Sequence, residues 1–103
     1  MELTMADRFL LPNVLPKEGN MKEIIIRKDI KKKVSFTQKE LLKYGVEVQK
    51  DQIQWNEEAS KAKFKIDFTD WEKEQVKIGL EIMDKAKKLT EEFEHLYELF
   101  IKI

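Results

Sequence analysis

The chain has 103 residues, of which 42% are hydrophobic, and its 20 lysines and arginines balance its 20 aspartates and glutamates. This length predicts one compact domain spanning residues 1–103, and the absence of cysteine excludes disulfides, cysteine-ligated metal sites and cysteine nucleophiles. The zero net charge lacks the positive excess typical of domains that bind mainly phosphates. The high charged fraction, with only three glycines, favours helices with charged faces.

Nothing in the sequence indicates insertion into a membrane. The chain contains no run of eighteen apolar residues, so we expect no membrane-spanning helix. The N-terminal segment MELTMADRFLLPNVLP carries acids where a signal peptide needs bases, and Pro12 and Pro16 interrupt its apolar stretch. We therefore expect a soluble cytoplasmic protein.

Five helix starts are predicted along the chain. Four of them pair a short polar residue with an acid three positions later, so that both side chains can accept hydrogen bonds from backbone N–H groups. These pairs are Thr4 with Asp7, Asn20 with Glu23, Thr37 with Glu40, and Thr69 with Glu72. The fifth start is Thr90, followed by Glu91 and Glu92, whose charges suit a helix N-terminus. Pro12 is expected to end the first helix, and Gly45 to end the third in a left-handed conformation.

Apolar and polar residues alternate between the third and fourth helices, which is the period of a β-strand. Residues 46–55, with Lys50-Asp51 at the centre, predict a β-hairpin, and residues 64–68 predict a third short strand. An isolated two-stranded hairpin is marginally stable, so the third strand or a helix should cover it.

Two apolar helices are expected at the C-terminus. The helix from about Asp70 to Leu89 carries a wide apolar arc, which suggests contact with two partners. The last helix needs the fourth helix as its partner. Its apolar face contains Phe93, Leu96, Tyr97, Phe100 and Ile103. The predicted fold class is α+β, with about five helices and a small antiparallel β-hairpin or three-stranded sheet between helix 3 and the C-terminal helix pair.

A basic stretch is the main candidate for a binding surface. In a helix over residues 21–34, one broad face carries Arg27, Lys28, Lys31 and Lys32, which can bind phosphate or an acidic protein patch. The favoured interpretation is an ordinary solvated face. Residues 69–103 contain nine acids and six bases, so the basic helix is expected beside the acidic C-terminal pair, or beside that of a second copy.

The two tryptophans flank the predicted β-region. Tryptophan is enriched at the centres of binding sites, so Trp55 is a candidate contact residue. Core packing is nevertheless the favoured role for both Trp55 and Trp71.

Catalytic chemistry has few candidate residues. His95 is the only histidine and is expected at the edge of a buried stripe. Asp67, Asp70 and Glu74 have a spacing that can hold a cation, but helix-start electrostatics explains them better. The sequence contains no phosphate-binding glycine loop, nucleophile motif or zinc motif. We therefore predict that the protein is not an enzyme and uses no cofactor or metal.

Four segments carry a resemblance to known proteins, namely LLPNVLPKEGN, KKKVSFTQKELLKYG, IQWNEEA and KKLTEEFEHLYELFI. Together they resemble a group of small proteins of unknown function encoded in bacteriophage and prophage genomes. The shared pattern falls on residues 15–19, 35–40, 55–56 and 88–90. These positions are turns, caps and core residues, so the resemblance implies a shared fold and a phage origin and transfers no catalytic or ligand residue.

Three functions remain open from the sequence. The favoured one is a small protein-binding module that modulates a host or phage protein. The first alternative is a winged-helix-like DNA-binding regulator, in which Gln38, Lys39 and Lys43 of the third helix contact bases or phosphates. Glu40 in that helix and the neutral charge weigh against DNA binding. The second alternative is an oligomeric structural or assembly component, in which the C-terminal helix packs against its copy.

Overall fold

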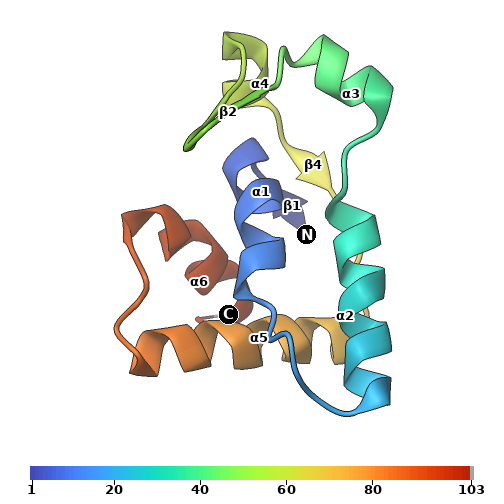
Figure 1. The fold of residues 1–103 in the computed structure, drawn as a ribbon, viewed down its shortest axis with the longest axis vertical. Helices are drawn as coiled ribbons and strands as arrows, with labels where there is room; N and C mark the ends of the chain where they lie inside the picture. The colour runs from blue at the N-terminus through green and yellow to red at the C-terminus, as the bar shows by residue number, and fades with distance from the viewer. Residues whose placement is uncertain (103) are drawn as a thin grey trace.

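The computed structural model describes residues 1–102 and confirms the α+β class. The elements in chain order are β1 (Glu2–Leu3), α1 (Met5–Val14), α2 (Met21–Val34), α3 (Gln38–Lys43), β2 (Glu47–Gln49), β3 (Gln52–Gln54), α4 (Glu57–Lys61), β4 (Phe64–Lys65), α5 (Asp70–Lys85), the 3₁₀ helix η1 (Glu91–Phe93) and α6 (Glu94–Phe100). In Figure 1, α5 runs across one end of the molecule, α1 and α2 stand on it side by side, and α3, the β2–β3 hairpin and α4 form the other end.

Four of the predicted helix starts form as expected. At α1, α2, α3 and α5, the cap side chain accepts from the N–H three residues later, and the acid at that position accepts from the cap N–H. Gly45 follows α3 with a φ of 57°, the left-handed conformation expected at that helix end. Local backbone chemistry therefore positions these helices along the chain.

Two other helix boundaries differ from the prediction. Pro12 lies inside α1 and does not end it, because a proline near the last turn costs a single backbone hydrogen bond and its fixed φ suits a helix. Thr90 makes no side-chain cap bond, and the chain enters α6 through η1. The structure also contains the unexpected helix α4, whose first turn is capped where Asn56 accepts from the N–H of Ala59.

The strands form two separate antiparallel pairs. β2 and β3 form the predicted hairpin around Lys50-Asp51. β4 pairs with β1 at the N-terminus, so the three-stranded alternative is wrong for this region. The reason is that the backbone of residues 2–3 offers β4 a partner, and pairing there places Leu3 in the core. The hairpin also lies at the end of the molecule away from α5, instead of against the C-terminal helix pair (Figure 1).

The hydrophobic core lies where α1, α2, α5 and α6 meet. Its buried members come from residues 3–34 and 68–100. α5 approaches the end of α1 closely at Gly79, where an added Cβ would lie 2.1 Å from the backbone oxygen of Val14. A glycine in α5 therefore allows the two helices to touch.

The apolar arc of α5 is only partly buried. Val76 and Leu80 are fully buried, as expected of a core stripe. Trp71 was predicted to be in the core, but it is 62% exposed, and its ring lies under the ammonium of Lys22 at 4.0 Å. The prediction is wrong because Trp71 lies on the solvent side of the first turn of α5, whereas Glu72, in the same turn, faces α2 and is buried.

The basic helix does pack against the acidic C-terminal region, as the charge distribution predicted. α2 crosses α5 (Figure 1), and Lys33 Nζ donates to Glu72 Oε1 at 2.5 Å. Burial acts to raise the pKa of Glu72, but the hydrogen bond from Lys33 and the N–H of Thr69 outweigh it and hold that pKa below its ordinary value. At this contact between α2 and α5, the opposite charges therefore pair with each other inside the fold.

Candidate protein-binding surface

The four residues of the predicted basic face do not share one surface. Arg27 is 5% exposed, so its inclusion in an exposed binding face was wrong. Its guanidinium donates to Gln75 Oε1 at 2.9 Å and to the backbone oxygens of Pro16 and Glu18 at 3.1 and 2.9 Å. Those carbonyls belong to the loop between α1 and α2, so Arg27 stabilises that loop against α5.

Lys28, Lys31 and Lys32 are exposed on α2, as predicted. None of them forms an ion pair within 4 Å in the part of the chain that the structure describes. They lie close together on one helix, and none of them lines the three main hollows of the described residues. A solvated face remains the better interpretation of these lysines.

The residues predicted to read DNA lie on a short, poorly supported helix. Gln38, Lys39 and Lys43 are all exposed on α3, which is six residues long and has no buried residue. A recognition helix needs a rigid support to hold it in the major groove. α3 packs no side chain into the core, and its link to α1 is the ion pair of Glu40 with Arg8.

The apolar face of the C-terminal helix α6 is covered by other helices of the same chain. Phe93, Leu96 and Phe100 are buried against the rest of the core, and α6 packs on α5 and α1. Ile103, which was also expected on this face, lies outside the described residues. The predicted self-association through this face is therefore disfavoured, because its apolar side chains are covered.

Trp55 lies at the end of a stack of three aromatic rings. It is half-buried, and its ring is 5.7 Å from that of Phe9, with only 3° between their planes. Phe36 stacks on Phe9 from the other direction, at 4.6 Å. The indole Nε1 donates to Ser60 Oγ at 3.0 Å, which fixes the orientation of the ring. Rings held in this way provide a rigid apolar surface.

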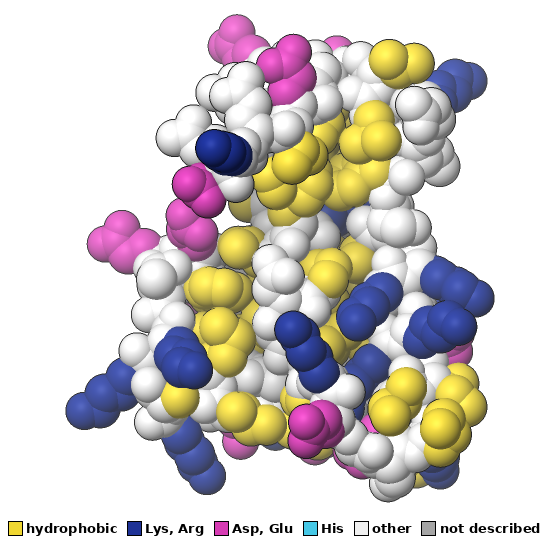
Figure 2. All heavy atoms as spheres, in the orientation of Figure 1, with side chains coloured by type: hydrophobic (Ala, Val, Ile, Leu, Met, Phe, Trp, Pro, Cys, Tyr) yellow, Lys and Arg dark blue, Asp and Glu magenta, His cyan; other side chains and the backbone are white. Residues whose placement is uncertain are grey.

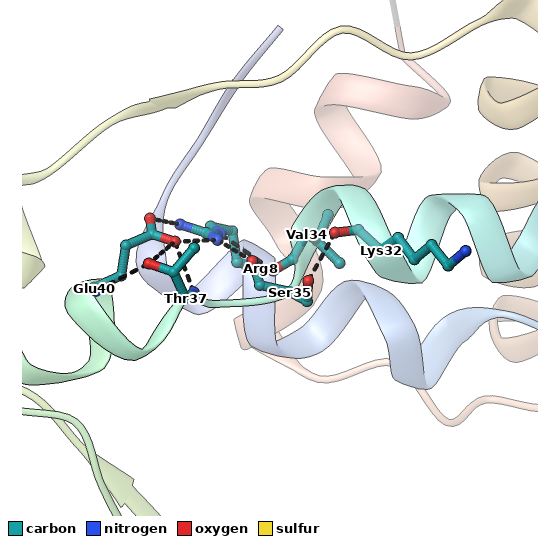
Figure 3. A network of polar contacts seen from close by, with 6 residues as sticks. All are labelled: Arg8, Lys32, Val34, Ser35, Thr37 and Glu40. Atoms are coloured by element: carbon teal, nitrogen blue, oxygen red, sulfur yellow. Dashed lines mark hydrogen bonds and ion pairs between the residues drawn. The ribbon is translucent and has the colours of Figure 1, made fainter.

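The buried side chain of Arg8 packs against Phe36, the ring at the opposite end of the stack from Trp55. The guanidinium carbon of Arg8 lies 3.9 Å from the ring centre of Phe36 and 4.5 Å from that of Phe64. Arg8 also donates to both carboxylate oxygens of Glu40, at 2.8 and 3.3 Å, and to the backbone oxygens of Val34 and Ser35, at 3.2 and 2.6 Å. Figure 3 shows the facing side chains of Arg8 and Glu40 and the cap that Glu40 forms with Thr37.

The same contact shifts the ionisation of Glu40. The hydrogen bond from the Arg8 guanidinium holds the pKa of Glu40 below its ordinary value, with the N–H of Thr37 contributing in the same direction. The carboxylate thus stays charged near neutral pH and keeps α3 attached to α1.

A groove lies between the hairpin and α1, with the aromatic stack at its base. Its volume is about 510 Å³, and it is lined by residues 51–55 of the hairpin, by Phe9 and Leu10 of α1, and by Glu92 of η1. Figure 2 shows apolar side chains gathered between the α3–hairpin end of the molecule and α1. A concave, mainly apolar groove with a few polar groups is the usual form of a binding site.

The other groups considered for chemistry have structural roles. His95 Nδ1 lies 2.5 Å from the buried carboxylate of Asp7, which also accepts from the N–H of Thr4, so the pair joins α6 to the start of α1. His95 lines none of the hollows found on the described surface. No group of three or more His, Cys, Asp or Glu side chains within residues 1–102 is arranged to hold a metal ion.

No family model, curated protein or solved structure matches the chain. The resemblance to small phage proteins therefore stays a prediction. Among the described residues, no helix combines the length and apolar character needed to cross a membrane.

Sequence reasoning identified Trp55 and missed its neighbours in the site. Phe36 comes just before the capping residue Thr37, a position where an apolar side chain often packs, and this signal could have indicated its role. Phe9 had no comparable signal. It approaches Trp55 only because the chain returns to α1 after 46 further residues, counting from 9 to 55.

Proposed function

We propose that the chain is a small, non-enzymatic protein-binding module of the phage type, which docks part of another protein in the groove between the hairpin and α1. The observation that carries this proposal is the aromatic stack of Trp55, Phe9 and Phe36, which ends in the groove and is supported by a buried arginine. A rigid, partly exposed tryptophan in a concave site is the usual centre of a protein interface.

One exposed apolar side chain lies in the groove itself. Ile53 is 40% exposed and lines the groove, and Leu42 and Val48 are exposed elsewhere on the same end of the molecule, while the other large exposed apolar side chains lie on α2 and α5. Burying such side chains against a partner would remove apolar surface from water, which favours binding. By contrast, Lys28, Lys31 and Lys32 of α2 do not line this groove.

Site-specific photo-crosslinking tests the proposal. We expect a photoreactive amino acid at Gln54, which lines the groove, to give discrete protein adducts in a lysate of the producing cells. The same group at Asp29, on the exposed side of α2, should give few. Trp55→Ala should abolish the adducts at position 54, whereas the matched control Trp71→Ala, at the other tryptophan, should leave them unchanged. Equal adducts at both positions, or adducts that survive Trp55→Ala, would contradict the proposal.

DNA binding is not adopted as the function, because the neutral charge and the poorly supported α3 weigh against it. A gel-shift titration at low and high salt separates the two functions. A shift that weakens steeply with salt and is lost in a Lys39→Ala, Lys43→Ala double variant would favour DNA binding.

A further inference from the structure

The free edge of β3 carries backbone groups that point away from β2. The register pairs Gln49 with Gln52, Val48 with Ile53, and Glu47 with Gln54. In an antiparallel hairpin the pair beside a two-residue turn exchanges hydrogen bonds, and the next pair directs its backbone groups outward. The N–H and C=O of Ile53 therefore face away from β2, and neither has a hydrogen-bond partner within residues 1–102.

The groove runs along this free edge. Five consecutive residues, 51–55, line it, although side chains along a strand alternate between two faces. A groove that meets every residue in succession borders the edge of the strand. α1 forms the opposite wall through Phe9 and Leu10. An extended segment laid along β3 would thus place every second side chain on an apolar wall.

The charge of the groove is negative. Asp51, at the hairpin turn, and Glu92, in η1, both line it, and no lysine, arginine or histidine is among the lining residues. Both carboxylates belong to exposed residues and remain accessible to a ligand. A segment with basic side chains between apolar ones would complement this groove, and an acidic segment would be repelled.

The three residues of β3 include no charged side chain and no proline, which are two of the usual protections of a strand edge against pairing. Exposed edges are commonly blocked by lysine, proline or a bulge, whereas the sequence of β3 is Gln-Ile-Gln. The hairpin has only two strands of three residues, and all six residues are exposed. Two strands alone are marginally stable, so a third strand would stabilise the hairpin as it binds.

We infer that the groove takes an extended segment of another protein, with alternating apolar and basic side chains, which adds to the edge of β3 as a third strand. This inference rests on the proposed function and specifies the class of partner. Binding by strand addition obtains its affinity from main-chain hydrogen bonds and its specificity from alternate side chains.

Synthetic peptides test the inference directly. The first probe is Ser-Val-Arg-Val-Arg-Val-Ser with both ends blocked, titrated into the Trp71→Phe variant so that Trp55 is the fluorescent reporter. Two analogues carry N-methyl groups, one on all three valines and the other on both arginines. In a bound strand, the N–H groups of alternate residues face β3, so they belong either to the valines or to the arginines. The analogue that methylates this set loses its hydrogen bonds and should bind about fivefold more weakly or worse, whereas the other analogue should bind like the parent.

The pattern across the two analogues distinguishes the possible outcomes. Equal binding by both would mean that the backbone makes no contact, and loss of both would indicate a helical or other geometry. Either result overturns the inference. Strand addition also predicts that the amide of Ile53 exchanges with solvent more slowly once the peptide binds, while an amide of α3, such as that of Lys39, is unaffected.

A charge test uses matched carboxamide variants. A Val-Glu peptide should bind at least about tenfold more weakly than the Val-Arg peptide, because two like charges face Asp51 and Glu92. The Asp51→Asn, Glu92→Gln double variant should reduce that difference, and the matched Glu81→Gln, Asp84→Asn variant on α5 should not. Equal affinity for both peptides, or no detectable binding of either, would overturn the inference. Loss of Trp55-dependent crosslinking at position 54 would instead overturn the proposed function, so the two failures are distinguishable.

Discussion

The molecule contains two regions of very different construction. The helical body, made of α1, α2, α5, η1 and α6, contributes nine of the twelve buried core residues, and the other three, Leu3, Leu15 and Phe68, lie in β1 and in the connecting segments. The hairpin lobe, residues 38–61, contributes only Ala59 to the buried apolar residues of the described chain. Val48, at the centre of β2, is 75% exposed. Stability therefore comes mainly from the body, while the candidate site lies where the lobe meets it.

This difference explains how a small chain can combine a stable core with an adaptable surface. Regions with few buried apolar contacts open at low free-energy cost, and binding elements are often found among them. The lobe is held to the body by a small number of specific contacts, chiefly those of Arg8 and the ring of Phe9. Substitutions in each region test how far the two regions are independent.

The largest effect is expected from replacing Arg8, the cation that joins the two regions. Arg8→Met removes four hydrogen bonds, which leaves the oxygens of Val34 and Ser35 without their donor and Glu40 with only its cap contacts to Thr37. Arg8 is buried but the Glu40 side chain is 29% exposed, so the loss in the free energy of unfolding should be about 3 kcal/mol, the lower end for buried pairs, measured by urea denaturation.

Lys61→Met is the matched control, because Lys61 forms only an exposed pair with Glu57. We expect that change to cost less than about 0.5 kcal/mol. Equal costs for the two variants would mean that Arg8 does not connect the regions.

A smaller loss of folding stability is expected from Gly79→Ala, a substitution within the helical body. The added methyl group would collide with the backbone oxygen of Val14, which cannot move without shifting the end of α1. Overpacking of this kind should cost about 1–3 kcal/mol, even though alanine is the better helix former. Thermal unfolding of the variant measures the loss, and an unchanged or higher melting temperature would show that α1 and α5 separate easily.

Acid should weaken both regions through one carboxylate in each. The pKa values of Glu40 and Glu72 lie below their ordinary value of 4.5 in the folded chain. A lowered pKa contributes stability that is fully present above pH 4.5 and is lost as the pH falls through the folded value. Glu40→Gln and Glu72→Gln should therefore each reduce stability at pH 7 and flatten its decline on acidification.

Urea denaturation at a series of pH values measures this effect. Glu81→Gln is the control, since Glu81 is exposed and forms no ion pair within 4 Å in the described chain. A decline that is the same in all three variants would show that the Arg8 and Lys33 contacts do not control the acid response.

The smallest change in folding stability is expected from substitutions in the hairpin itself. Val48→Ala should change the free energy of unfolding by less than about 0.5 kcal/mol, because the side chain is exposed. Leu80→Ala, in the body, should cost about 2–5 kcal/mol. Hydrogen exchange should likewise be faster at the amides of β2 and β3 than in α5. A hairpin as well protected as α5 would contradict the division into two regions.

The sequence by itself determined the local features of this protein. Four capping boxes, the left-handed Gly45 and the hairpin turn at Lys50-Asp51 all form as predicted. Each of them depends on backbone groups within a few residues, whose hydrogen bonds do not need a distant partner.

Only the tertiary structure decided which elements meet. It paired β4 with β1, buried Arg27 against the loop before α2, left Trp71 exposed, and brought Phe9 against Trp55 to form the groove. These outcomes depend on which helix faces approach one another. A charged or aromatic side chain has the same local pattern whether a neighbour covers it or water does, so packing decides whether it stabilises the fold or remains available to bind.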